Sequence, residues 1–576
     1  MTRSDHHRRS KPKPRIINDS TEQLLIECDV LVIGGGPAAT WAAVSALDVE
    51  NISVVLVDKG YCGASGVAAT SGVNHWLSDP NSVTREQEIQ LKSAVGGDLS
   101  DHSWISSVLD ESWTQIHKLP AWGWGRVEKH SVSPSLSLSS EKTTKGKIPR
   151  PFFRGPAPDY LRFMRGQVKR RGGLILDHSP AYSLLQNTLT DAVAGARGYQ
   201  RQKDRPWKVI SKAVILATGG TTWKSHSQGG DVNTGDGQLM AAEAGAVFSG
   251  MEFSNFQGMV PFGTSMDKNG FFVHASYWDE DGHPIEYIDL HESRLPLLEK
   301  SMHGTIYAQF TQFTQDQFDT LRANMPNFFA VVDKLGIDPF NQRFPIDWVN
   351  EGTVRGTGGV YIADTTCRTG IPGLYVAGDV ATRDQIAGAA TGAGGPNLSW
   401  AVATGAWSGK HGAEYASNTA FPSNFIEIGT VATKTSPSSQ KSDTNNSVVD
   451  VKTLTSRLQA EMLPLSKAVI RSEENLQQIA HNLELIWSDL ASVVPKSFKE
   501  EAEYREVAGM TAMARWATAS ALHRKESRGM HFRADFPNRS AEFDHRTISG
   551  GLVDVWASSK IPSPSIFIEP LLVSSQ

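Results

Sequence analysis

Cysteine is scarce in this sequence. Cys28, Cys62 and Cys367 lie far apart along the chain, and no two of them form a CxxC pair. This spacing excludes a disulfide framework, a zinc site and an iron–sulfur cluster built from this chain alone. We therefore expect no metal site here.

Long apolar runs and a strong charge bias are missing as well. No stretch of 18 or more apolar residues occurs, so no segment is expected to span a bilayer. The formal net charge is only −5, with 39% hydrophobic and 20% charged residues, which is typical of a soluble globular protein. Nucleic acid is therefore not an expected partner.

The length of the chain points to several folding units. A chain of 576 residues is too long for a single hydrophobic core, so two or three units are expected, one of them interrupted by another. Residues 1–25 are basic and rich in Pro and His, without the apolar stretch of a signal peptide. They are predicted to be a disordered tail of a cytoplasmic protein.

The first chemical motif lies in a β-α-β pattern near the N-terminus. The apolar run CDVLVI at 28–33 predicts a buried strand, PAATWAAVSAL predicts a helix, and ISVVLVD at 52–58 predicts a second strand. Between the first strand and the helix, GGGPAA places Gly34, Gly36 and Ala39 in a G-x-G-x-x-A pattern. Asp58 ends the second strand.

These residue types suit a bound dinucleotide. Gly34 allows a sharp turn, Gly36 allows backbone N–H groups to reach a pyrophosphate, and Ala39 allows the helix to pack closely on the strand. Asp58 is at the distance from the glycines where an acidic side chain binds a ribose. A lone glycine triplet is often only a tight turn, but strand, helix and carboxylate in register favour the dinucleotide site.

Three later segments also end apolar strands or begin helices with small residues. They are AVILATGG at 213–220, NTGDGQLMAAEAGA at 233–246 and GGVYIADTTCRTGIPGLYVAGD at 358–379. Small side chains at strand ends leave room for a flat cofactor in the crevice of an open α/β sheet. Each segment alone is more commonly a turn at a strand end, whereas the ordered set favours the cofactor site.

With VAATSGVN at 67–74 and ESRGMHFRADFP at 526–537, these motifs cover most of the chain. In this order they resemble the fumarate reductase, succinate dehydrogenase and L-aspartate oxidase flavoproteins, and more distantly the α subunit of adenylylsulfate reductase. The resemblance implies a Rossmann-like α/β FAD-binding domain interrupted by an α+β capping domain and followed by a C-terminal helical domain. It also implies that Asp236 and Asp379 are flavin-binding carboxylates.

The cofactor is expected to be FAD, bound without a covalent bond. Relatives that attach the flavin use a histidine just before the VAA-like loop, and here that place is held by Ser65 and its neighbours. The residues expected to bind FAD are Gly34, Gly36, Pro37, Ala38, Ala39, Asp58, Lys59, Ser65, Gly66, Ala68, Ala69, Gly72, Ala217, Thr218, Gly219, Asp236, Asp379, Asn397 and Leu398.

The substrate residues of the resembling enzymes are not present. Gln257 stands in place of a histidine, Val354-Arg355 replaces a second histidine segment, no RGEGG string occurs between Met259 and Gly352, and residues 389–392 contain no arginine. A neutral amide does not form the same charge-assisted bond to a carboxylate. These losses beside an intact flavin frame predict a substrate other than succinate or fumarate.

Arg355, Gln257 and Arg383 are the candidate catalytic residues. Arg355 lies in the loop that faces the flavin in the resembling enzymes, where a fixed cation would hold an anion or stabilise negative charge on the flavin. A solvated arginine with an acidic neighbour is the competing interpretation. His274 and Tyr277 are weaker candidates, because they lie in an aromatic segment more typical of packing.

The expected domains are an FAD-binding domain at 26–265 and 346–415, a capping insertion at 266–345, a linker at 416–450 and a helical domain at 451–576. The predicted function is FAD-dependent two-electron transfer on a small-molecule substrate. One alternative is a flavoprotein subunit that passes electrons to a separate iron–sulfur protein, as in adenylylsulfate reductase. A second alternative is a flavin-binding protein without turnover.

Overall fold

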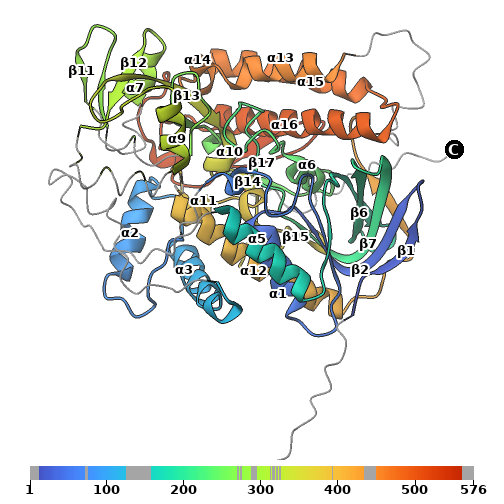
Figure 1. Ribbon diagram of the computed structural model, residues 1–576. Coiled ribbons are helices and arrows are strands. Elements are labelled where there is room, and N and C mark those ends of the chain that lie inside the picture. Colours follow the sequence, from blue (N-terminus) through green and yellow to red (C-terminus); the bar gives the residue numbers. More distant parts are fainter. Residues whose placement is uncertain are drawn as a thin grey trace, which may run out of the picture.

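The computed structural model describes residues 12–71, 75–124, 157–268, 275–286, 295–311, 326–391, 394–433 and 449–560, together with residues 272, 313, 318 and 322. A large twisted sheet with its helices forms the body, a smaller sheet lies at one end of it, and long C-terminal helices lie across both (Figure 1). This arrangement is the α/β fold with a capping unit and a helical unit that the sequence predicts.

The centre of the large sheet is parallel. β2 (Leu24–Ile33) pairs with β7 (Arg205–Leu216) along its whole length, and β3, β4 and β15 extend the parallel part. Because parallel strands end at the same edge, the loops after β2, β3, β7 and β15 meet there. The bounds of the last three strands are Val54–Val57, Leu174–Leu176 and Leu374–Val376.

Antiparallel strands extend the sheet on the other side of β7. The order runs β16-β5-β6-β7-β2-β3-β4, with β1 paired to β2. The bounds are Arg15–Asp19 for β1, Ala181–Asn187 for β5, Val193–Gln200 for β6 and Phe425–Ile428 for β16.

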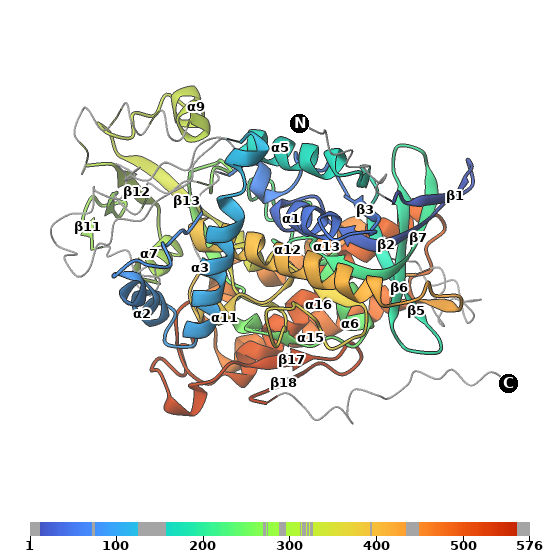
Figure 2. The same cartoon turned by 90° about the horizontal axis from the view of Figure 1, so that it is seen from below.

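Helices cover the parallel strands. α1 (Pro37–Leu47) packs against the long α12 (Gly394–Ser417), and α5 and α3 lie beside them (Figure 2). α1 is almost fully buried, which its alanine-rich sequence allows. The other helices of the body are α2 (Arg85–Val95), α3 (His102–Ile116), α5 (Ala157–Arg170), α6 (Asp236–Glu243) and α11 (Asp384–Ala387).

The capping unit is built on a five-stranded sheet of order β11-β10-β12-β13-β9. Its core is rich in phenylalanine, including Phe310, Phe328, Phe340 and Phe344. The bounds are Phe256–Pro261 for β9, Ser276–Trp278 for β10, Pro284–Ile285 for β11, Ile306–Gln309 for β12, Phe344–Glu351 for β13, Leu295–Ser301 for α7 and Pro326–Lys334 for α9. The short helix α10 (Gly352–Arg355) leads back to the body.

The C-terminal helices share the core of the body. α16 (Phe498–His523) is buried along most of its length, and the ring of Trp516 stacks on that of Phe248 at 4.0 Å between centroids. Its neighbours are α13 (Val451–Met462), α14 (Leu465–Ala468) and α15 (Glu473–Ser492). A four-stranded sheet joins this region to the body, with the strands β14 (Gly359–Val360), β8 (Phe248–Ser249), β17 (Ile548–Gly550) and β18 (Trp556–Ser558) in that order.

Strand pairing corrects several predicted boundaries. The capping sheet begins at Phe256 and ends at Glu351, outside the predicted 266–345, because β9 and β13 pair with each other. β1 lies inside the predicted disordered tail and β16 lies inside the predicted linker, since each adds to an open strand of the large sheet. β17 and β18 lie in the region predicted to be helical.

No helix in the described part of the chain has both the length and the apolar character needed to cross a bilayer.

Candidate functional site

The glycines of GGGPAA form a tight turn and an open helix start. Gly34 has a φ of +125°, and a Cβ at this position would lie 2.1 Å from the carbonyl oxygen of Ala217. A Cβ on Gly36 would meet no atom within 4 Å, so space remains in front of it. α1 begins after Gly36 without a side-chain cap and without an acidic residue in its first turn. Its free N–H groups suit an anion such as a diphosphate.

The predicted cofactor residues that the structure describes are either buried or half-buried. Gly34, Ala38, Ala39, Asp58 and Ala217 are buried, as their packing roles require. The others are half-buried within largely buried segments, and Gly72 lies outside the described residues. The half-buried set comprises Gly36, Pro37, Lys59, Ser65, Gly66, Ala68, Ala69, Thr218, Gly219, Asp236, Asp379, Asn397 and Leu398.

These segments lie next to one another at the carboxyl edge of the sheet. A Cβ on Gly219 would lie 2.1 Å from Asn233 Nδ2, and one on Gly66 would lie 4.0 Å from Asn233 Oδ1. Gln238 Nε2 donates to the carbonyl oxygens of Gly219 and Asp379, at 2.9 and 3.3 Å. The loop after β3, the loop after β7 and the turn after β15 therefore border one surface.

Buried oxygens without a donor face this region. The side-chain carbonyl oxygens of Asn233, Gln238 and Asn397 have no hydrogen-bond partner among the described residues. Buried acceptors normally have a donor, so these three oxygens are available to a bound molecule that supplies N–H or O–H groups. The sequence prediction missed Asn233 and Gln238 as ligands, although both lie in the quoted TGDG segment.

The predicted carboxylates differ in their surroundings. Asp58 Oδ1 accepts from the N–H of Gly60 at 3.1 Å and Oδ2 accepts from the hydroxyl of Ser65 at 2.9 Å, while burial raises the pKa of Asp58. Asp236 pairs with Lys59 at 2.8 Å. Glu506 of α16 lies 3.2 Å from the same lysine. Lys59 thus links the cofactor edge to the C-terminal helices.

A cluster of charged side chains lies at the base of the capping sheet. Lys268 contacts both Asp267, at 2.5 Å, and Glu351. Glu351 is fully buried, and its second oxygen lies 3.6 Å from Arg355 Nη1. Burial and the charge of Glu351 raise the pKa of Asp267 to about 6. We call Asp267, Lys268, Glu351 and Arg355 the cap-base cluster.

The cap-base cluster faces the flavin edge of the body. Asp267 accepts from the N–H of Gln228 at 2.9 Å, and Thr70 of the loop after Gly66 donates to the carbonyl oxygen of Gln228 at 3.0 Å. Lys268 is near enough to Asp379 for its charge to lower the pKa of that carboxyl, which burial raises overall. The cluster was not predicted, apart from Arg355. A glycine at position 258 is the sequence feature that goes with the cluster, because a Cβ there would lie 2.6 Å from Glu351 Oε1.

Arg355 and Arg383, both predicted to be catalytic, have different places. Arg355 keeps 21% of its side chain exposed, lies over the ring of Phe256, and has a buried Nε without a hydrogen-bond partner. Arg383 is 1% exposed, and its guanidinium binds Asp379 and the carbonyl oxygens of Thr353, Val354 and Gly356. These bonds hold α10 to the turn after β15, and the catalytic role of Arg383 stays a prediction.

Gln257 is buried, and hydrogen bonds through Asn255 link its side chain to the C-terminal helices. Its Nε2 donates to Asn255 Oδ1 at 3.1 Å, and Asn255 Nδ2 donates to the carbonyl oxygen of Ala468 in α14. Of the weaker candidates, Tyr277 is buried in the core of the capping unit and donates to the carbonyl oxygen of Phe272. His274 lies outside the described residues.

Comparison with known proteins identifies the fold and the cofactor together. The FAD binding domain family matches residues 29–396, and the family described as the fumarate reductase flavoprotein C-terminal domain matches residues 456–557. The chain belongs to this FAD-binding family. It is an FAD-dependent oxidoreductase related to fumarate reductase flavoproteins and L-aspartate oxidases.

Individual relatives are distant. The chain is similar to an uncharacterized FAD-dependent oxidoreductase of Methanocaldococcus jannaschii, with 25% identity over 91% of this chain and 97% of that protein. It is 26% identical to L-aspartate oxidase of Streptomyces coelicolor over 62% of this chain and 63% of that protein. Adenylylsulfate reductase of Archaeoglobus fulgidus has a similar fold, with a TM-score of 0.71 and 18% identity over 96% of this chain and 98% of that one.

The flavoprotein's residues fit FAD. The open space before Gly36 suits the diphosphate, and the donor-less oxygens of Asn233, Gln238 and Asn397 suit the hydrogen-bonding groups of the ribityl chain and the flavin ring. When bound, FAD supplies hydride-transfer chemistry. The individual contacts of the predicted cofactor residues remain predictions.

We expect the purified flavoprotein to be yellow and to release its FAD on acid precipitation. Ser65, Gly66 and their neighbours offer no histidine for a covalent bond. The absorbance of the supernatant after precipitation measures the released flavin. Flavin that stays with the denatured pellet would contradict the non-covalent assignment.

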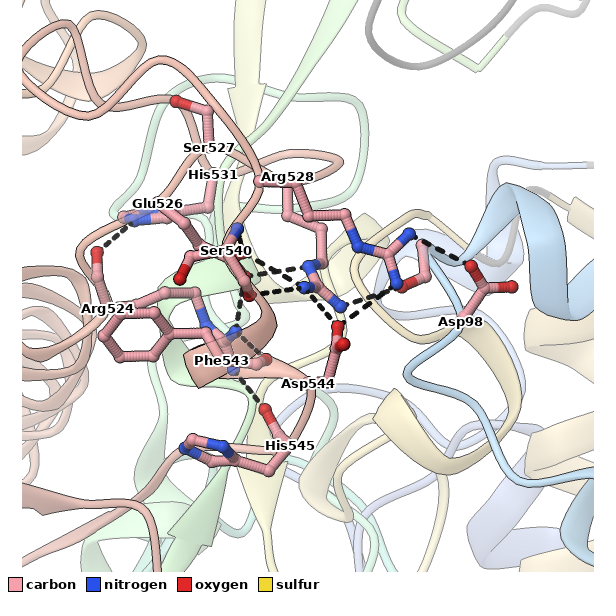
Figure 3. Close-up of polar contacts among 12 residues, drawn as sticks. Asp98, Arg524, Glu526, Ser527, Arg528, His531, Ser540, Phe543, Asp544 and His545 are labelled. Carbon is pink, nitrogen blue, oxygen red and sulfur yellow. Dashed lines mark hydrogen bonds and ion pairs between the residues drawn. The ribbon is translucent and has the colours of Figure 1, made fainter.

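The C-terminal motif ESRGMHFRADFP folds into a buried ion-pair network (Figure 3). Glu526 accepts from Arg524 Nη1 at 2.7 Å and from Arg528 Nη2 at 3.0 Å. Arg524 also binds Glu252, at 2.7 Å, in the segment that leads to β9. His531 Nδ1 lies 2.7 Å from Arg471 Nη1, and burial followed by the charge of Arg471 holds the pKa of His531 well below its usual range. This network connects the helical unit to the body.

Proposed function

We propose that this flavoprotein catalyses two-electron transfer between FAD and a small-molecule substrate other than succinate or fumarate. The observation that carries the proposal is the position of the cap-base cluster. Its Lys268 is close enough to Asp379, a predicted cofactor residue, for their charges to interact, and Arg355 is its partly exposed member. A substrate between the two would be shielded from water by the capping unit and held by Arg355.

The charges at this site argue against a small dicarboxylate. Each of the three described cations at the base of the cap already has a carboxylate partner: Lys268 has Asp267 and Glu351, Arg355 has Glu351, and Arg383 has Asp379. A dicarboxylate needs two cations or donors free to bind it. Gln257 offers only an amide in the place where the resembling enzymes have a histidine.

Transfer of electrons to a separate iron–sulfur protein is the second candidate. The observation that favours it is the similarity in fold to adenylylsulfate reductase over almost the whole chain. The three cysteines of this chain are all buried and separate, so any cluster would belong to the partner. Co-purification of iron with a second protein would support this candidate.

Anaerobic flavin bleaching tests the proposed function. The FAD-loaded protein is mixed with a panel of monocarboxylates, amino acids, thiols and sulfur oxyanions, and absorbance is followed near about 450 nm, where oxidised flavin absorbs. A donor that bleaches the flavin establishes two-electron chemistry. If no compound of the panel bleaches the flavin, the result supports flavin binding without turnover instead.

With that donor, Arg355→Met is expected to slow single-turnover bleaching by a factor of about a hundred to a thousand, the usual cost of losing one charged donor in a shielded site. FAD occupancy and folding should not change. Arg368→Met is the control, because Arg368 is exposed on the surface of the body and pairs only loosely with Asp364. Equal rates for Arg355→Met and the native protein would shift the assignment to Gln257.

A further inference from the structure

The charge balance of the cap-base cluster depends on one residue. Glu351 is the shared partner of both cations: one of its oxygens binds Lys268 and the other lies 3.6 Å from Arg355 Nη1. That second oxygen has no hydrogen bond although it is fully buried. Without Glu351, Lys268 would keep only Asp267, and Arg355 would have no acidic partner among the residues described for the cluster.

Glu351 is held firmly in this place. It ends β13, whose Asn350 pairs with Gln257 of β9, and its side chain fills the space left by Gly258. Arg383 fixes the helix that follows by binding the carbonyl oxygens of Thr353, Val354 and Gly356. The carboxylate is thus positioned between two cations by the backbone on both sides of it.

A buried carboxylate in this position acts against doubly charged ligands. It offsets the attraction of Lys268 and Arg355 for an anion and repels a second negative charge brought to the site. Of these two cations only Arg355 is partly exposed, with 21% of its side chain accessible against 5% for Lys268. One guanidinium edge binds one anionic group.

We propose that Glu351 is the charge-selectivity residue of this site and that the substrate carries a single negative charge. The proposal rests on the proposed function, since it takes the space between the cap-base cluster and the flavin edge as the substrate site. Glu351 acts through Lys268 and Arg355 and is a positioning residue. By pairing with Lys268, it leaves Arg355 as the one cation of the pair that is open to an anion.

The test compares the binding of succinate and propanoate to the FAD-loaded protein by isothermal titration calorimetry near neutral pH. The native protein is expected to prefer propanoate. Glu351→Gln keeps the size of the side chain and removes the charge, so its preference should shift toward succinate by at least about tenfold. Glu351→Asp keeps the charge and should restore the native preference.

Glu461→Gln is the matched control. Glu461 is also a mostly buried carboxylate paired with a lysine, Lys467 at 2.8 Å, but it lies among the C-terminal helices. The ratio of its affinities for succinate and propanoate should equal that of the native protein. A Glu351→Gln protein that holds FAD and keeps the native ratio would overturn the proposal.

Asp267→Asn covers the case in which Glu351→Gln does not fold or bind FAD. It removes the other carboxylate of Lys268 and should shift the ratio toward succinate by a smaller amount. No shift in that variant would also overturn the proposal. If neither acid binds any of the proteins while a donor still bleaches the flavin, the selectivity proposal fails and the proposed function stands.

Discussion

Gly36→Val is expected to fold and to contain no FAD. Gly36 has φ −79° and ψ −170°, a conformation that valine adopts readily, and its Cβ would meet no protein atom within 4 Å. The fold therefore tolerates the added side chain. The same side chain would fill the space before the first N–H groups of α1, where the diphosphate approaches the backbone.

The ratio of absorbance near about 450 nm to that of the protein measures FAD occupancy in this variant. Circular dichroism confirms that the chain folds. Gly166→Val is the matched control, because a Cβ on Gly166 in α5 also meets no atom within 4 Å, and this variant should keep its FAD. Full occupancy in Gly36→Val would show that the diphosphate binds elsewhere.

Arg524→Met is expected to lower the free energy of unfolding by about 3–5 kcal/mol, the cost of leaving buried charges without their partner. Arg524, Glu252 and Glu526 are all fully buried. Arg524 also donates to the carbonyl oxygens of Phe543 and His545 at 2.9 and 2.6 Å, so these acceptors would be left unsatisfied too.

Urea unfolding of the FAD-loaded protein measures this loss, and Arg539→Met provides the comparison, because Arg539 joins the same network through Asp544. Arg539 binds Asp98 and Asp544 at 3.0 and 3.2 Å but is 45% exposed. Its removal should cost about 0–1 kcal/mol, as for other surface pairs. Equal losses in the two variants would mean that burial does not determine the strength of this network.

Local sequence patterns predicted the flavin half of the molecule well. The helix predicted at PAATWAAVSAL is α1 with the same bounds, because a helix start after GGG and an alanine-rich core leave little choice. The apolar strand end expected within AVILATGG at 213–220 is the end of β7, at Leu216. Within the region expected to be helical, Pro464 separates α13 from α14, since proline lacks the backbone donor that a continuous helix needs.

Pairing between distant segments was harder to predict. β16 has only Phe425–Ile428 and gains its structure from the edge of β5, so no local signal separates it from the linker around it. Lys268 and Glu351 are far apart in the sequence, and the pairing of β9 with β13 helps to bring their segments together. Asn233 and Gln238 were overlooked for a different reason: their importance lies in oxygens without donors, which only coordinates reveal.

The hydrogen bonds of Arg383 limit how the capping unit can move relative to the body. Its buried guanidinium holds α10 and Asp379 together, so α10 cannot shift against the sheet without breaking several charge-assisted hydrogen bonds at once. An opening of the cap that kept these bonds would bend β9 and β13 at their far ends, at Pro261 and Phe344. The outer strands β10 and β11 would then move as a unit about these two positions. Glu351 and Arg355 would keep their places beside the predicted cofactor residues.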